Sequence, residues 1–314
     1  MSQHNPPEAA ERDAYLRMRR WAAPLGGSAW AKFFTGPKNI PICDFTPQAH
    51  PDAICLPDGA VSLADTPADT RAEIALALPA GPGISLAAFI GTSLPGVMAA
   101  RIKWDVRELV GPNPTPAQAV ALERCVFNAR HRVLHRPTRF SLLLTLPEPP
   151  ENAAPVGQEF IALTARLHEP VESYVPFTLA ILPPEANQKF TLGNRTSLLA
   201  WLRARRIELL TPESSPFEDT ARLMARATRV LLLDPRQAAL LGLCNPRTKV
   251  LEVAPEGWAS GRARALCDAL GLEWRIFLAT PPFYPLLRPL PFGTITLLSY
   301  EVPIKSLGHS LRSL

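Results

Sequence analysis

The segment Val230-Leu-Leu-Leu-Asp-Pro-Arg-Gln237 decides how the surrounding chain is interpreted, because it joins an uninterrupted apolar run to a polar turn. An apolar run without alternation is typical of a buried parallel strand. Asp234 and Pro235 are residue types that favour a helix N-cap and a first helical position, so we expect a short helix at 237–243. A buried strand that leads directly into a helix is the repeating unit of an α/β fold.

The same alternation of helix and strand extends from Thr191 to Thr280. Apolar residues at helical spacing predict helices, and the short apolar runs between them predict strands. We expect helices at 194–205, 217–227 and 259–270, and strands at 175–182, 206–210, 249–253 and 273–279. This order predicts a doubly wound parallel sheet, a fold that binds ligands beyond the carboxyl ends of its strands.

The first half of the chain has a less regular pattern, with expected helices at 8–23 and 115–130 and expected strands within 40–63, at 74–78 and at 140–146. Prolines and glycines divide the uncharged stretch 74–100 into pieces shorter than the roughly 20 residues of a membrane span. We therefore interpret it as a buried strand, turn and helix. Gly81-Pro-Gly83 lies at that turn, and a phosphate site there is the less favoured interpretation because the full dinucleotide motif is absent.

The Pro-rich segment 146–155 lacks a hydrophobic period, which is typical of a linker or a long surface loop. We therefore divide the chain into an N-terminal α/β domain at 1–150 and a C-terminal Rossmann-like domain at 151–314. The second domain also has an expected helix at 160–167, and it ends with an expected strand at 294–302 and a polar tail.

The composition is that of a globular protein, with 47% hydrophobic and 19% charged residues in a chain of 314. A net charge of +5 without clustering suits an anionic ligand or a membrane surface, and it argues against nucleic-acid binding. The five cysteines lack metal-ligand spacing, so neither a metal site nor a disulfide framework is predicted. The polar N-terminus has no signal region, which predicts a cytoplasmic protein.

Two basic segments leave alternatives open. Arg17-Met-Arg-Arg-Trp21 suits a peripheral contact with the inner face of a membrane or with a partner protein, although packing against the domain is the favoured interpretation. His131 and His135 lie in the most basic segment, 130–139, and a helix there would place both on one face. They are our candidates for a catalytic base, and a solvated basic turn before the strand at 140–146 is the alternative.

Several segments in the second half follow one another in a recognisable order. They are Asn194-Arg-Thr-Ser-Leu-Leu-Ala-Trp-Leu202, Arg206-Ile-Glu-Leu-Leu210, Ala227-Thr-Arg-Val-Leu-Leu-Leu233, Asn245-Pro-Arg-Thr-Lys-Val-Leu-Glu-Val-Ala-Pro255 and Ala265-Leu-Cys-Asp-Ala-Leu-Gly-Leu-Glu-Trp274. This order resembles the C-terminal half of glycosyltransferase family 61 over about residues 175–280. The resemblance implies a GT-B fold with two Rossmann-like domains. It also implies an inverting, metal-independent transfer of a sugar from a UDP- or GDP-sugar to a glycan acceptor, with no permanently bound cofactor.

The resemblance places the donor site at the carboxyl ends of the C-terminal strands, and the residues it implies there are Asn194, Arg195, Asp234, Arg236, Gln237, Arg247 and Glu252. The chain departs from the family at this site. Where the family has Gly-Pro-His-Gly-Ala-Gly-Leu, this chain has Asp234-Pro-Arg-Gln-Ala-Ala-Leu240. A carboxylate at a helix N-terminus is unfavourable for a diphosphate, although Arg236 could partly offset it.

We therefore keep three hypotheses. The first is a family 61-like glycosyltransferase that acts in polysaccharide synthesis, with His131 or His135 as the base. The second is a non-catalytic relative that serves as a binding or assembly module in the same process, and the third is an unrelated α/β enzyme. The space around Asp234–Gln237 discriminates the first two, since an open pocket lined by Arg236 favours the enzyme and a loop closed by Gln237 favours the module.

Overall fold

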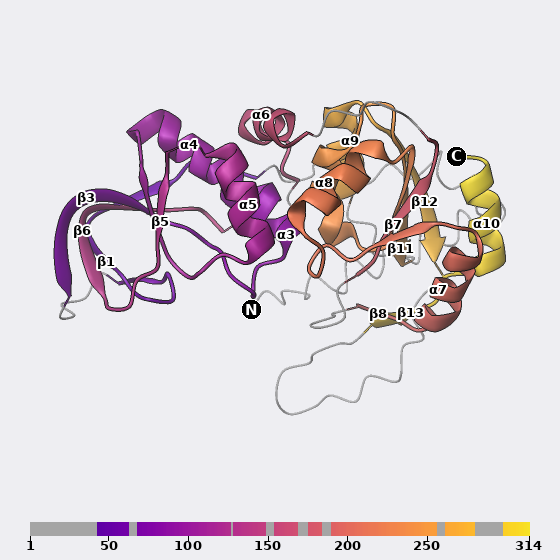
Figure 1. The fold of residues 1–314 in the computed structure, drawn as a ribbon, viewed down its shortest axis with the longest axis horizontal. Helices are drawn as coiled ribbons and strands as arrows, with labels where there is room; N and C mark the ends of the chain where they lie inside the picture. Colours follow the sequence, from indigo (N-terminus) through magenta and orange to yellow (C-terminus); the bar gives the residue numbers. More distant parts are fainter. Residues whose placement is uncertain are drawn as a thin grey trace, which may run out of the picture.

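The computed structural model of the protein describes residues 43–62, 68–126, 128–148, 154–168, 175–183, 190–255, 261–279 and 298–314. The expected helix at 8–23 and the basic segment Arg17–Trp21 lie outside these ranges. Within them the chain forms two large sheets, one wholly before residue 150 and one wholly after residue 151, and a small two-stranded sheet in the second half. Figure 1 shows the sheets at opposite ends of the molecule, with helices between them.

The C-terminal sheet has five parallel strands in the spatial order β12-β11-β10-β7-β9. The strands are β7 (Thr178–Ile181), β9 (Glu208–Leu210), β10 (Arg229–Leu232), β11 (Lys249–Pro255) and β12 (Glu273–Ala279). All five were expected from the sequence, and the predicted parallel sheet is confirmed. Alternate residues of β10 point to opposite faces, so Val230 and Leu232 enter one core and Leu231 enters another.

Helices cover both faces of this sheet. They are α7 (Arg195–Ala204), α8 (Phe217–Arg226), the 3-10 helix η2 (Pro235–Leu243), α9 (Arg262–Leu270) and α10 (Ile304–Arg312). Leucines of α7 and α10 pack on one face, and apolar residues of α8, η2 and α9 pack on the other. Gly271 ends α9 in a left-handed conformation, with φ 70°, as expected of a glycine C-cap.

The end of the chain differs from the prediction. A polar tail was expected, but 304–312 forms α10, and Leu307 and Leu311 are buried with Leu314 against the C-terminal sheet. The spacing of four residues puts the two helical leucines on one side of α10. Of the strand expected at 294–302, the described part forms β13 (Leu298–Tyr300), which pairs in parallel with β8 (Phe190–Leu192).

The N-terminal sheet has six strands in the spatial order β2-β1-β6-β3-β4-β5. The strands are β1 (Gln48–Cys55), β2 (Val61–Ser62), β3 (Asp69–Ala77), β4 (Glu108–Val110), β5 (Arg130–Arg132) and β6 (Thr138–Thr145). β6, β3, β4 and β5 are parallel, and β1 is antiparallel to both of its neighbours, so the sheet is mixed.

The uncharged stretch 74–100 is the end of β3, a turn, and a continuous helix made of α3 (Leu86–Ala88), a π-helical turn η1 (Phe89–Ser93) and α4 (Leu94–Trp104). Phe89, Ile90 and Leu94 are fully buried. The predicted buried strand, turn and helix is confirmed. In the described parts of the chain, no helix combines the length and the apolar character needed to cross a bilayer.

The helix expected at 115–130 is shorter than predicted. α5 (Pro116–Cys125) begins with Thr115 and Gln118 in a capping box. It ends early, and Asn128 then adopts a left-handed conformation with φ 64°. Arg130 begins β5 instead, with its amide donating to the carbonyl of Arg107 at 2.8 Å.

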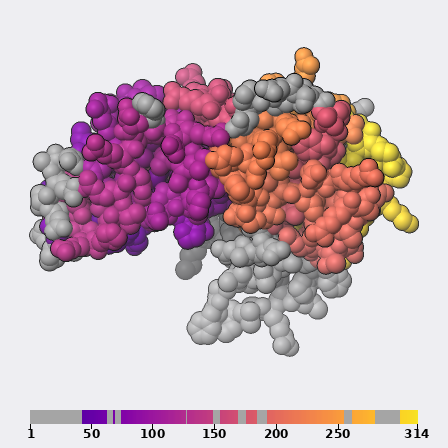
Figure 2. Space-filling view, viewed as in Figure 1, coloured from indigo at the N-terminus to yellow at the C-terminus, as the bar shows by residue number. Residues whose placement is uncertain are grey.

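One core of buried residues runs through both halves of the chain. Phe89 and Ile90 of the N-terminal half belong to it together with Leu240 of η2 and Phe160 of α6 (Gln158–Leu167). Gly91 lies so close to η2 that a Cβ there would stand 2.7 Å from the Cβ of Ala239. In Figure 2 the two halves meet without a gap where the N-terminal surface adjoins α8.

Candidate functional site

The C-terminal sheet changes direction of winding between β7 and β10. Within this sheet, the strand that comes after β7 is β9, which pairs on one side of β7. The strands β10, β11 and β12 then extend the sheet on the other side. Ligands of open α/β sheets bind beyond the carboxyl ends of the strands at such a switch point. The residues that follow β10 here are Leu233 and Asp234, so the predicted donor loop lies at the expected edge.

The carboxylate of Asp234 binds Arg236, so the N-terminus of η2 is not left open to a ligand. Oδ1 accepts hydrogen bonds from the amide and from Nε of Arg236, both at 2.9 Å. Oδ2 accepts from Nη2 of Arg236 at 2.8 Å. The Asp234 side chain is only 5% exposed. The predicted N-cap is confirmed, and this ion pair raises the pKa of Arg236, so the positive charge that could offset Asp234 for a ligand is already used.

Gln237 is buried beneath the same loop and is hydrogen-bonded on both its backbone and its side chain. Its amide donates to the carbonyl of Asp234 at 3.0 Å, and its Nε2 donates to Oε1 of Glu213 at 2.8 Å. The side chain is buried, and so is the rest of η2 after it. The amides of Arg236 and Gln237, which a phosphate would need at a helix N-terminus, are therefore both occupied by Asp234.

Other predicted donor residues surround this loop. Nη1 of Arg195 donates to the carbonyl of Pro183, just after β7, at 3.4 Å. Asn194 has a structural role, since its side chain donates to the carbonyl of Val302 at 2.8 Å and accepts from the amide of the same residue at 3.1 Å. These bonds connect the start of α7 to the segment that leads into α10.

Tyr300 was not predicted, and it lies at the same edge. Its hydroxyl donates to the carbonyl of Leu233 at 3.1 Å. Burial raises the pKa of Tyr300, the charge of Asp234 raises it further, and Arg236 and Arg195 lower it. Arg262 also interacts electrostatically with Asp234, and burial lowers the pKa of that arginine. The edge thus gathers several arginines around one buried carboxylate.

Two predicted residues lie elsewhere. Arg247 is exposed in the turn before β11, which is the amino end of that strand and the opposite edge of the sheet. Glu252 lies in the middle of β11 and is completely buried. Its Oε2 accepts from Nε1 of Trp274 at 3.0 Å, and its Oε1 has no hydrogen-bond partner among the described residues. Burial raises the pKa of Glu252 to about 7.

The two candidate bases do not share a helix face, because 130–132 is a strand and not a helix. His131 lies in β5, where burial lowers its pKa and a hydrogen bond to the backbone of Pro112 opposes that shift. His135 is exposed in the turn between β5 and β6. The structure therefore matches the alternative interpretation, a solvated basic turn before a strand, only after residue 132, because 130–132 belongs to β5 and His131 is half-buried.

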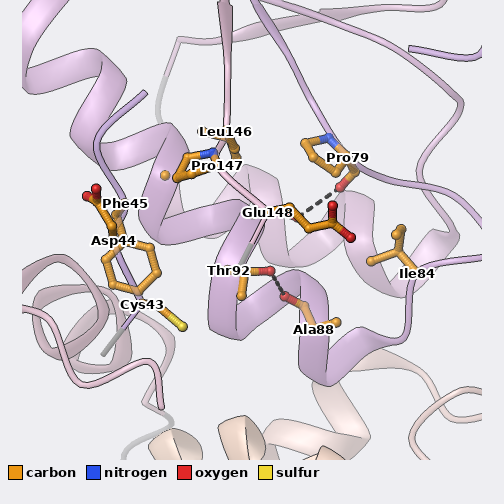
Figure 3. Close-up of a pocket in the computed structure, with 12 residues that line it drawn as sticks. Cys43, Asp44, Phe45, Pro79, Ile84, Ala88, Thr92, Leu146, Pro147 and Glu148 are labelled. Carbon is orange, nitrogen blue, oxygen red and sulfur yellow. Dashed lines mark hydrogen bonds between the residues drawn. The ribbon is translucent and has the colours of Figure 1, made fainter. Parts of the chain in front are cut away.

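A pocket occupies the switch point of the N-terminal sheet. The next strand in the chain after β3 is β4, which pairs on one side of β3. The strand β6, which comes later in the chain, pairs on the other side. The pocket has a volume of about 340 Å³ and lies beyond the carboxyl ends of β3 and β6 (Figure 3). Its lining comes from three segments, namely Cys43–Phe45, the chain from Pro79 to Gly96, and Leu146–Glu148.

Sequence reasoning missed this pocket. Residues 146–148 were part of a predicted linker. The strands at 74–78 and 140–146 were predicted, but their pairing, which brings residues 146–148 close to the segment after Gly81-Pro-Gly83, was not. The π-helical turn η1 supplies two of the lining residues, Thr92 and Ser93. A single π turn within a helix is frequent at functional sites, but a sequence pattern does not reveal it.

Comparison with known proteins adds no assignment, since no family model matches the sequence and no curated protein is significantly similar to it. Among the described residues, no group of three or more His, Cys, Asp or Glu side chains is arranged to hold a metal ion.

Proposed function

We propose that the protein is a non-catalytic relative of the family 61 glycosyltransferases, which keeps a GT-B-like pair of α/β domains and serves as a binding or assembly module in polysaccharide synthesis. The two sheets and the resemblance of segments in 175–280 support the relationship. We infer the loss of transferase activity from one observation, the bidentate contact of Asp234 with Arg236.

This contact disfavours a nucleotide diphosphate for an electrostatic reason. A helix N-terminus binds a phosphate through open amides and a partial positive charge. Here the carboxylate of Asp234 already accepts the amide and the guanidinium of Arg236. A diphosphate at this end would have to displace a buried carboxylate and would meet its negative charge. Gln237 further fills the space that the family leaves to glycine.

A specific observation supports a second candidate, an active, inverting and metal-independent transferase. Arg195 and Arg262 both interact with the edge that holds Asp234 and Tyr300. Clustered arginines suit the phosphates of a UDP- or GDP-sugar. In that case the donor would bind beside η2 rather than at its N-terminus. The base on the glycan acceptor would come from the N-terminal half, with the half-buried His131 as the candidate.

Thermal unfolding of the full chain with UDP, GDP, CMP and dTDP, each with and without a sugar, tests the proposal. A ligand that binds only the folded protein adds about 2.7 kcal/mol of stability at a hundred times its Kd. We expect no shift of Tm with any of these compounds at millimolar concentration. A shift with one diphosphate that disappears in Arg195→Ala would overturn the proposal and identify the donor class of an active transferase.

The variant Asp234→Asn makes the test sharper. Asparagine is as good an N-cap as aspartate, so the helix end is kept while its charge is removed. If Asp234 is what excludes a diphosphate, the variant gains a nucleotide-dependent shift that the natural chain lacks. Equal and absent shifts in both proteins would leave Gln237 and the buried η2 as the cause of exclusion.

A further inference from the structure

We propose that the pocket at the carboxyl ends of β3 and β6 binds a small molecule that combines an apolar body with a protonated amine. The volume of about 340 Å³ is at the lower end of the range for small-molecule sites, roughly 300–1,000 Å³. The location is the one that open α/β sheets use for ligands, where neighbouring connections leave a strand in opposite directions.

The wall of the pocket is mainly apolar. Phe45, Ile84, Ala88 and Leu146 contribute to it, together with two prolines. The hydroxyls in the wall are engaged within the protein, since Thr92 donates to the carbonyl of Ala88 at 2.6 Å, and Ser93 donates to the carbonyl of Pro79 at 2.9 Å. Binding an apolar group here would therefore leave neither hydroxyl without its partner.

The charge of the lining selects a cation. The charged residues that line the pocket are Asp44 and Glu148, and its described lining contains no lysine, arginine or histidine. Oδ1 of Asp44 accepts the amide of Thr46 at 2.8 Å. Figure 3 shows the carboxylate of Glu148 lying between Pro79 and Thr92 and pointing toward Ile84, whereas that of Asp44 points away from them. Glu148 is thus the residue placed to contact an amine.

One wall of the pocket is held in place before a ligand binds. Nε2 of the buried Gln118 donates to the carbonyl of Ile84 at 2.7 Å and to that of Gly81 at 3.1 Å. Its Oε1 accepts the amide of Gly81 at 2.8 Å. A preformed wall reduces the ordering that binding would otherwise require.

This inference is independent of the proposed function, because the pocket belongs to the N-terminal sheet and Asp234 belongs to the C-terminal one. Calorimetric titration of the full chain with hexylamine, hexanol and hexanoate tests it, since the three share one apolar chain and differ in charge. We expect hexylamine to bind about fivefold more tightly than hexanol, which is the gain in affinity that one exposed ion pair, here with Glu148, provides. We expect hexanoate not to bind. Equal binding of the three, or no binding of hexylamine, would overturn the proposal.

Two variants connect the binding to this pocket. Glu148→Gln should reduce the affinity for hexylamine to that for hexanol with an unchanged Tm, because Glu148 is exposed. Ala88→Leu should fill the pocket and weaken both ligands. Glu123→Gln, an exposed glutamate of α5 outside the lining, is the matched control and should bind as the natural chain does. An unchanged hexylamine affinity in Glu148→Gln would contradict the assignment of the amine to this residue.

Discussion

The carboxylate of Asp234 holds the guanidinium of Arg236 through both of its oxygens, at 2.9 Å to Nε and 2.8 Å to Nη2, across a single intervening proline. Arg236→Ala would remove the guanidinium hydrogen bonds of a buried carboxylate and keep the one from the backbone amide of residue 236. We expect the free energy of unfolding to fall by about 1–3 kcal/mol, measured by urea denaturation. Arg222→Ala is the control, because its ion pair with Asp219 is exposed and should contribute less than about 1 kcal/mol. Equal losses in the two variants would contradict this account.

Gly91 allows the N-terminal half to approach η2. Gly91→Ala would place a Cβ 2.7 Å from that of Ala239, which is closer than packed carbon atoms allow. We expect a loss of about 1–3 kcal/mol, as for other overpacked cores, and a lower Tm by calorimetry. Gly83→Ala is the matched control, since nothing lies within 4 Å of a Cβ there. A Tm of Gly91→Ala equal to that of the control would mean that the two halves separate easily.

The elements of the C-terminal sheet could be predicted because each of them has a local signal. The apolar run at Val230, the cap at Asp234 and the terminal glycine at Gly271 depend on residues close to one another in sequence. The helix α10 was missed because Gly308 and several polar residues interrupt the pattern of Leu307 and Leu311. Its stability comes from the sheet beneath it, which a local pattern cannot include.

The candidate site was less predictable, since it depends on strand order. Phe45, Thr92 and Glu148 line one pocket, although about 50 residues separate each from the next in sequence. Only the pairing of β3 with both β6 and β4 brings these segments together. His131 and His135 do not share a helix face, because 130–132 pairs with β4 and forms the edge strand of the sheet. Here pairing with another strand outweighs the helical spacing of the two histidines.

The side chain of Gln118 makes four hydrogen bonds, two accepted and two donated. Three of them connect the start of α5 to the turn after β3, and the fourth is accepted from the amide of Thr115. Gln118→Ala would remove all of them and leave the buried groups of Gly81 without their partners. We expect a loss of about 2–4 kcal/mol, measured by urea denaturation, because unpaired buried polar groups are costly. Gln158→Ala, at the exposed first position of α6, should cost less than about 0.5 kcal/mol. A loss in Gln118→Ala no larger than this would show that water replaces the four bonds.

Glu252 makes stability depend on pH. Its pKa is about 7 in the folded protein against 4.5 in the unfolded chain, because burial penalises the charged form. The unfolded chain therefore loses its proton first as the pH rises, and the folded protein loses stability between pH 4.5 and pH 7, by on the order of 3 kcal/mol. Glu252→Gln removes this titration and keeps an oxygen for Nε1 of Trp274. Urea denaturation should show its advantage over the natural chain growing through that pH window and constant above it. Parallel pH profiles for Glu252→Gln and the natural chain would mean that Glu252 is already charged in the fold.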